Sequence, residues 1–325
     1  MAAFATNTGE GHLIRAELWS SELKETLKDQ LMGIKYCRML GSEFPDGDTF
    51  TIPSIGDPEV YNYEEGQALR FTGMDTGEFQ FSVTDYIAAG TSISYKFMQD
   101  SYYAAELERT FTPKQQRALA EAIEVALLMT PTPAGTGGQT TADSNTINGA
   151  KHRMIGSGTN ETLDIVDFAK ARYALQKANV PLTNLVAFVD PTVEHALATQ
   201  ANLVNFLSPV PKWNGVVDSG LSSGMKFITN IYGFDVYTSN WLHTNTASEA
   251  IDGVTAAAGV NNLFFSADAM VTPMIGQIRQ PPRVQYIDNV YLQQHEYAVT
   301  CRFGFKLFRP ENMVIIVTDT DQVYA

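Results

Sequence analysis

A single serine, Ser222, stands in a pattern that is typical of a catalytic nucleophile. The segment 220–224, GLSSG, matches the Gly-x-Ser-x-Gly turn, in which a preceding strand and a following helix expose the hydroxyl on a strained turn. Here a polar loop precedes the motif and a strand-like segment, 226–232, follows it. The flanking structure is therefore wrong, and we interpret the motif as a flexible loop. A serine hydrolase that uses Ser222 with His243 or His295 is the alternative from another functional class.

A glycine-rich segment, 133–140, loosely suggests a phosphate-binding loop. Its sequence is PAGTGGQT. A P-loop needs Gly-Lys-Ser/Thr at the entry to a helix, but Gln139 occupies the lysine position and no helical pattern follows. We therefore reject this motif.

The histidines and cysteines do not form a metal or redox site. The two cysteines, Cys37 and Cys301, are too few for a disulfide framework or a four-thiolate zinc site. Both lie on apolar faces, where cysteine is a small buried hydrophobe. The histidines have neither HExxH spacing nor the companions of a zinc ligand; they are His12, His152, His195, His243 and His295. The sequence thus predicts no metal and no cofactor, and a protein that is not an enzyme.

The composition describes an acidic chain with enough apolar residues for a sizeable core. Of 325 residues, 44% are hydrophobic and 11% aromatic, and 36 acidic against 22 basic residues give a net charge of −14. Phosphate contacts need clustered lysine and arginine, so general nucleic-acid binding is disfavoured. The start, MAAFATNTGE, has no basic or apolar signal region, and no run approaches eighteen apolar residues. We expect no secretion signal and no membrane partner.

The N-terminal region is predicted to be an arm followed by a helix. Residues 1–16 are small and polar, whereas Leu23, Leu27 and Leu31 recur at the i, i+4 and i+8 spacing of a helical stripe that Trp19 extends. Gly33 ends this helix.

Residues 46–94 are predicted to form a long two-stranded excursion with a polar tip. Phe79, Phe81 and Val83 alternate with polar residues, as in a half-buried strand. The segment holds a single base, Arg70, against nine acids: Asp46, Asp48, Asp57, Glu59, Glu64, Glu65, Asp75, Glu78 and Asp85. Because so long a hairpin is marginal alone in water and no partner for it is evident in its own chain, we expect another chain to support it.

The remaining segments predict an α+β fold. A helix is expected over 95–129, broken near Phe111 because Thr112, Pro113 and Gln115 form a restart signal. An α/β pattern follows between the loops 131–160 and 245–260, and the strand 296–307 alternates most clearly. Its partner is expected to be 313–317. The α/β elements are a helix over 163–178, with Asp164 and Asp167 in its first turn, and strands at 185–189, 226–239 and 262–265.

This order of elements resembles the major capsid protein of tailed bacteriophages, with the Hong Kong 97-type (HK97-like) coat fold. Six segments carry the resemblance, in order along nearly the whole chain: 14–31, 46–94, 113–130, 185–197, 231–241 and 302–315. They look like the family's arm and first helix, its E-loop, its spine helix, two parts of its axial domain and the closing strands of its peripheral domain. The implied regions are 1–45 (arm and first helix), 46–94 (E-loop), 95–133 (spine helix), 134–276 (axial domain) and 277–325 (peripheral strands).

The resemblance implies a structural protein of the virion. Copies would form pentamers and hexamers of an icosahedral shell, assembled in the host cytoplasm, that encloses packaged double-stranded DNA without gripping it. A separate scaffolding protein, a portal and a decoration protein are the implied partners. Another shell component, such as a decoration protein, is a further alternative. Some family members cross-link through an E-loop lysine, but 46–95 contains none, so we expect a non-covalent shell.

Charged residues are a further hypothesis for the contacts between subunits. Arg70, at the hairpin tip, and a basic surface on the neighbour would help to place the acidic E-loop, in which Glu64 and Glu65 are the acids whose charge reversal should impair the shell. The residues expected at inter-subunit contacts are Trp19, Glu64, Glu65, Arg70, Lys114, Arg117, Arg302 and Lys306.

Overall fold

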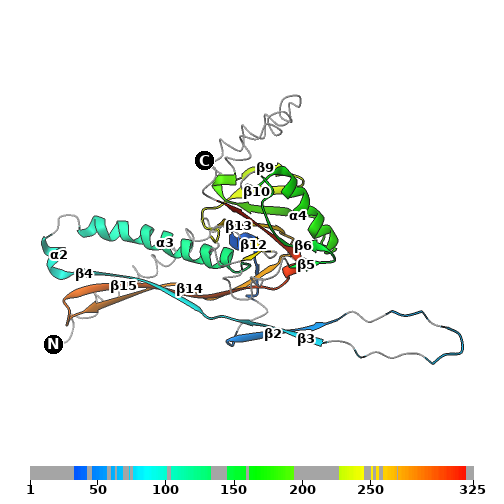
Figure 1. Ribbon diagram of the computed structural model, residues 1–325. Helices are drawn as coiled ribbons and strands as arrows, with labels where there is room; N and C mark the ends of the chain where they lie inside the picture. The colour runs from blue at the N-terminus through cyan, green and yellow to red at the C-terminus, as the bar shows by residue number, and fades with distance from the viewer. Residues whose placement is uncertain are drawn as a thin grey trace.

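The computed structural model of the chain (Figure 1) describes residues 33–41, 46–56, 60–62, 64–68, 73, 76–100, 104–132, 145–158, 161–193, 227–244, 250–251, 254–255, 259–268 and 270–319. The predicted arm and first helix, with Trp19, lie outside these residues. So do Arg70, the 133–140 segment and the Ser222 motif. No helix of the described residues is long and apolar enough to cross a membrane.

A six-stranded mixed sheet forms one half of the fold. Its strand order is β7-β16-β13-β8-β10-β9. The three strands β16, β13 and β8 are buried at every residue, as expected for strands covered on both faces. The bounds are β7 Arg153–Ile155, β8 Leu185–Val189, β9 Phe227–Ile231, β10 Phe234–Thr238, β13 Gly259–Ser266 and β16 Met313–Asp319.

Helix α4, Ile165–Lys177, covers one face of this sheet and confirms the predicted helix. Phe168 packs there against Phe264 at a ring distance of 5.2 Å. Asp164 is the N-cap, and Asp167 completes a capping box. Asp167 is fully buried and accepts hydrogen bonds from the Ser157 amide and hydroxyl at 2.9 and 2.5 Å. The free amide groups at the helix start are satisfied by the capping box, in which the Asp164 amide donates to Asp167 at 3.1 Å and the Ile165 amide donates to Asp164 at 2.6 Å.

A four-stranded sheet, in which three strands are long and β1 is short, forms the other half, in the order β1-β14-β15-β4. Its inner face carries Cys301, Phe303 and Phe305, which share one core with the stripe Leu119, Ile123 and Leu127 of α3. Figure 1 shows α3 running along the sheet. The bounds are β1 Arg38–Met39, β4 Asp85–Ser94, β14 Met274–Asn289, β15 Gln294–Leu307 and α3 Ala104–Met129.

The predicted break in the long helix is wrong. Helix α3 continues through Phe111 and Pro113, whereas the preceding helix, α2, Tyr95–Asp100, is a separate element. Proline removes a single backbone hydrogen bond from a helix, and the 26-residue α3 keeps its remaining bonds on both sides.

The predicted pairing of 313–317 with 296–307 is also wrong. Strand β16 lies between β13 and β7, while β15 pairs with β14 and β4. The physical reason is burial: every residue of β16 is buried, so both faces of this strand need cover. The turn η3, Pro310–Asn312, redirects the chain, and the Phe308 amide donates to the Pro273 carbonyl at 2.8 Å.

The excursion at 46–94 is shorter than predicted. Strands β2, Thr49–Ile55, and β3, Thr76–Ser82, form a two-stranded ribbon. Strand β4, however, pairs with β15 over its whole length, so this part does have a partner in its own chain. Further short elements are η1 Gly33–Tyr36, β5 Thr146–Ile147, β6 Ala150–Lys151, β11 Ala250–Ile251 and β12 Val254–Thr255; the last four lie in segments predicted to be loops.

Candidate inter-subunit surfaces

The described residues provide no cluster for metal chemistry, because no group of three or more His, Cys, Asp or Glu side chains among them could hold an ion. Cys37 and Cys301 are buried, as predicted, and both thiols are free. Burial raises the pKa of Cys301 to about 11 and raises that of Cys37 as well, so both thiols are protonated and unreactive at neutral pH. The functional candidates are therefore the parts that project from the two sheets.

The β2–β3 ribbon, which we call the hairpin, projects from the body of the molecule (Figure 1). Beyond its paired strands, Val60 is 97% exposed, and Glu64 and Glu65 are exposed as well. The Gln67 amide donates to the Glu64 carbonyl at 3.2 Å. An apolar side chain and two carboxylates are thus presented to solvent far from the core.

The base of the hairpin is packed against the body by apolar side chains. Phe81 and Val83 are 0% and 1% exposed and share a small core with Leu40 and Ile275. Phe79 meets Phe308 edge-on at 5.0 Å. Fully burying such side chains contributes roughly 1.5–3 kcal/mol each, so the base is part of the folded subunit.

Three cations from the long strands also hold the base of the hairpin. Arg302 pairs with the Asp48 carboxylate at 2.5 Å and donates to the Val83 carbonyl at 3.0 Å. Lys306 donates to the Gln80 carbonyl at 2.7 Å. Arg279 donates to the Gly47 carbonyl at 2.5 Å. Both strands of the hairpin are therefore held where they leave the body.

Gly304 lies between Arg302 and Lys306, where the hairpin base crosses β15. A Cβ atom at this position would lie 2.9 Å from the Ser82 carbonyl oxygen and 3.0 Å from the Val83 Cα. Real Cβ atoms rarely approach backbone this closely, and only glycine leaves room for the crossing. Cys301, Phe303 and Phe305 belong to the α3 core, so the crossing occupies the opposite face of β15.

The turn between β14 and β15 presents a second exposed apolar surface, which we call the tip. Tyr291 is fully exposed, and Ile287, Val290 and Leu292 are 59%, 66% and 63% exposed. An exposed apolar group of this kind on a soluble protein marks an interaction site.

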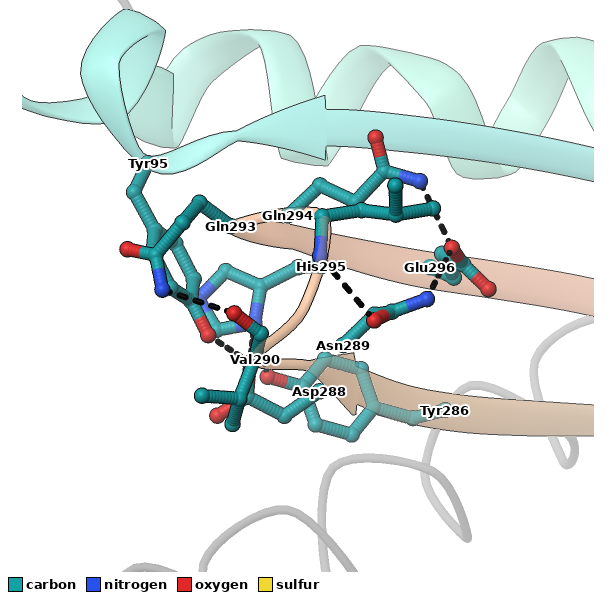
Figure 2. A network of polar contacts seen from close by, with 10 residues as sticks. Tyr95, Tyr286, Asp288, Asn289, Val290, Gln293, Gln294, His295 and Glu296 are labelled. Atoms are coloured by element: carbon teal, nitrogen blue, oxygen red, sulfur yellow. Dashed lines mark hydrogen bonds and ion pairs between the residues drawn. The ribbon is translucent and has the colours of Figure 1, made fainter.

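A polar network braces the tip from behind (Figure 2). The Tyr95 hydroxyl donates to Asp288, and the Tyr286 hydroxyl contacts the His295 ring nitrogen Nδ1. The Tyr95 ring meets the His295 ring edge-on at 4.8 Å. Asn289 donates to Glu296 at 3.1 Å. The network thus ties the first residue of α2 to both strands that lead into the turn.

The structure places six of the eight residues predicted at subunit contacts. Glu64, Glu65 and Lys114 are exposed. Arg117 pairs with Glu121 on its own helix at 2.7 Å. Arg302 and Lys306, which were expected to receive a neighbour's E-loop, contact the hairpin of their own chain instead. Contacts across subunits by these residues stay a prediction, and Trp19 and Arg70 lie outside the described residues.

Sequence reasoning missed Arg279 and the tip. The tip had a readable signal, because Val290, Tyr291 and Leu292 are consecutive apolar residues in a turn. Arg279 had none, since its contact with Gly47 joins segments 232 residues apart.

Comparison with known proteins yields one family and one fold. A family model described as phage capsid protein matches residues 77–316, whereas no curated protein matches the chain. A chain from Mycobacterium phage Che8 has a TM-score of 0.61 at 15% identity, covering 88% of this chain and 90% of that one. The capsid of Ralstonia phage GP4 gives 0.59 at 11%, covering 87% of each.

An encapsulin complex from Synechococcus elongatus is also similar, with a TM-score of 0.55 at 9% identity and coverage of 85% and 84%. At such identities these structures establish the shared fold. The family match, by contrast, spans most of the chain, from β3 to within β16. The chain therefore belongs to the phage capsid protein family and has the Hong Kong 97-type fold of tailed-phage major capsid proteins.

Proposed function

We propose that this capsid shell protein assembles as pentamers and hexamers into an icosahedral phage head, with its hairpins lying across neighbouring copies. The observation that carries the proposal is the hairpin itself. Its base is part of the folded subunit, while Val60, Glu64 and Glu65, which lie beyond its paired strands, are exposed to solvent. Because these groups lie outside the folded body, only another chain can bury the apolar side chain and pair the two carboxylates. Arms of this kind make association between copies obligatory.

The exposed tip supports the same proposal at the opposite end of the long sheet. Its apolar side chains are exposed, and the strands that carry them are linked by the network around Asp288 and His295. Contact with further copies would remove them from water, which stabilises an assembly by about 25 cal/mol per Å² of apolar surface buried.

The charge of the chain supports enclosure of double-stranded DNA without tight binding. A net charge of −14 repels phosphate at long range, so the inner surface would let DNA enter and leave. A scaffolding protein, a portal and a decoration protein are proposed as separate partners, with assembly in the host cytoplasm.

The proposal is tested by reversing the charge at the end of the hairpin. Glu64→Lys with Glu65→Lys should prevent or misdirect shell formation, as seen by electron microscopy of the protein expressed with and without a scaffold. Circular dichroism should show an unchanged subunit, since both side chains are exposed. Adding Lys114→Glu and Arg117→Glu should restore shells if those cations receive the hairpin. Normal particles from the first variant at low salt would overturn the proposal.

A non-covalent shell is proposed because 46–95 lacks lysine. Purified shells dissolved in detergent should then give a single band at 35.7 kDa. A ladder of multiples would contradict this.

A further inference from the structure

The hairpin joins the body through a two-residue connection on one side, since Val83 and Thr84 lead from β3 into β4. On the other side, residues 46–48 are the described residues that lead into β2. Apolar packing holds the base of the hairpin, because Phe81 and Val83 are buried with Leu40 and Ile275, and Phe50, Ile52 and Phe79 pack against this cluster. We call this packed base the pivot. Phe50 pairs with Phe81 and Ile52 pairs with Phe79, so the apolar side chains of the two strands lie on one face of the ribbon, and polar contacts at the base add to the restraint on its direction.

Those polar contacts come from Arg279, Arg302 and Lys306, which we call the root clamp. The clamp acts on both sides of the pivot: Arg279 and Arg302 bind residues 47 and 48 before β2, while Lys306 and Arg302 bind the carbonyls of Gln80 and Val83. Lys306 also lies over the Phe79 ring, 4.8 Å from its centre. Contacts on both strands resist rotation in a way that the pivot alone does not.

The polar contacts of the root clamp and the apolar contacts of the pivot differ in their exposure to solvent. The side chains of Arg302 and Asp48 are 40% and 70% exposed, so their pairing adds little to the stability of the fold and is screened by salt. Phe81 is shielded from both water and ions. Salt or a substitution can therefore release the clamp while the pivot remains.

We infer that the root clamp sets the direction in which the hairpin leaves its own subunit, and that Arg279, Arg302 and Lys306 are positioning residues for shell assembly. The inference deepens the proposed function and rests on it. Small tilts at the base are amplified along the hairpin. Seven residues of β2 at about 3.3 Å each give a lever of about 23 Å, so a tilt of about 10° displaces the end of that strand by about 4 Å.

The inference is tested by measuring the hairpin direction in unassembled subunits. Spin labels are placed at Ser54→Cys near the end of β2 and at Gln176→Cys on α4, both exposed positions. The native cysteines do not interfere, since they are buried thiols. Pulsed electron resonance gives the distribution of distances. We expect Arg302→Ala with Lys306→Ala to widen the distribution of distances and to shift its mean by several ångströms. A tilt of about 10° displaces the end of β2 by about 4 Å, which sets the scale of this shift.

Three controls keep the outcome interpretable. Arg283→Ala removes an exposed cation from β14 and should leave the distribution unchanged. The exchange Asp48→Arg with Arg302→Asp should restore a narrow distribution. In the unsubstituted protein, about 1 M salt should widen it, because the Debye length falls to about 3 Å; this arm needs no substitution that might unfold the subunit.

An unchanged distribution in both the double variant and high salt would overturn the inference. The proposed function is judged separately: if Glu64→Lys with Glu65→Lys still gives normal shells, the proposed function fails, whatever the labels show. If that variant blocks assembly and the labels do not move, the clamp alone is refuted.

Discussion

Replacing Gly304 by alanine should displace the base of the hairpin and destabilise the subunit. The added Cβ would lie 2.9 Å from the Ser82 oxygen and 3.0 Å from the Val83 Cα, about half an ångström inside ordinary contact distance. Both obstacles are backbone atoms, so they cannot rotate away. Forcing extra volume into a packed site costs typically 1–3 kcal/mol, and we expect a loss of about 2 kcal/mol in the free energy of unfolding.

Urea denaturation of unassembled subunits measures this loss, and hydrogen exchange locates it. Amides of β3 should exchange faster in Gly304→Ala, while those of β8 stay protected. Gly90→Ala is the matched control: it lies on the adjacent strand β4, and its Cβ would meet the Tyr297 carbonyl oxygen at an ordinary 3.8 Å. That variant should be neutral or slightly stabilising. Equal unfolding midpoints for the two variants would refute the close crossing at Gly304.

Three further predictions concern buried groups. Burial lowers the pKa of His152 below its ordinary value of 6.5, and this effect outweighs the hydrogen bond to the Ala150 carbonyl. The contribution of His152 to stability is therefore fully present above about pH 6.5 and falls at lower pH. His152→Gln should reduce the change in the urea midpoint between pH 7.5 and pH 5.5. Cys301, with its pKa raised to about 11, should resist iodoacetamide at pH 8 in native subunits and react in urea; rapid native labelling would show that the strand is open. Asp167→Ala should cost about 2 kcal/mol, because this fully buried carboxylate accepts hydrogen bonds from both Ser157 groups and from the Asp164 amide of the capping box. Lys170→Ala, at a side chain 44% exposed, should cost under about 1 kcal/mol in the same urea assay.

Local patterns predicted the elements whose burial repeats along the chain. The alternation at 297–307 marks β15, and Leu119, Ile123 and Leu127 mark the buried face of α3, because burial on one side imposes a period of two or 3.6 residues. The start of α4 was predicted in part: Asp164 and Asp167 were placed together in its first turn, whereas the structure makes Asp164 the N-cap and Asp167 its capping-box partner.

Pairing between distant strands was not predictable in the same way. Nothing local in 313–319 distinguishes a partner of β15 from a strand between β13 and β7, and the shortest connection is the natural but wrong guess. The site shows the same division. Arg302 and Lys306 could be identified as candidates because they lie on the polar face of a predicted strand. Their contacts with the hairpin of their own chain could not be predicted, because these contacts depend on the crossing at Gly304.

The position of β16 has a consequence for the timing of synthesis. This strand, at 313–319, is interior to the six-stranded sheet and separates β7 from the other four strands. A nascent chain that has not yet reached residue 319 therefore carries a split sheet with apolar strand edges open on both sides of the gap. We therefore expect the six-stranded sheet to close only after residues 313–319 have left the ribosome, so that shorter nascent polypeptides do not present a complete subunit.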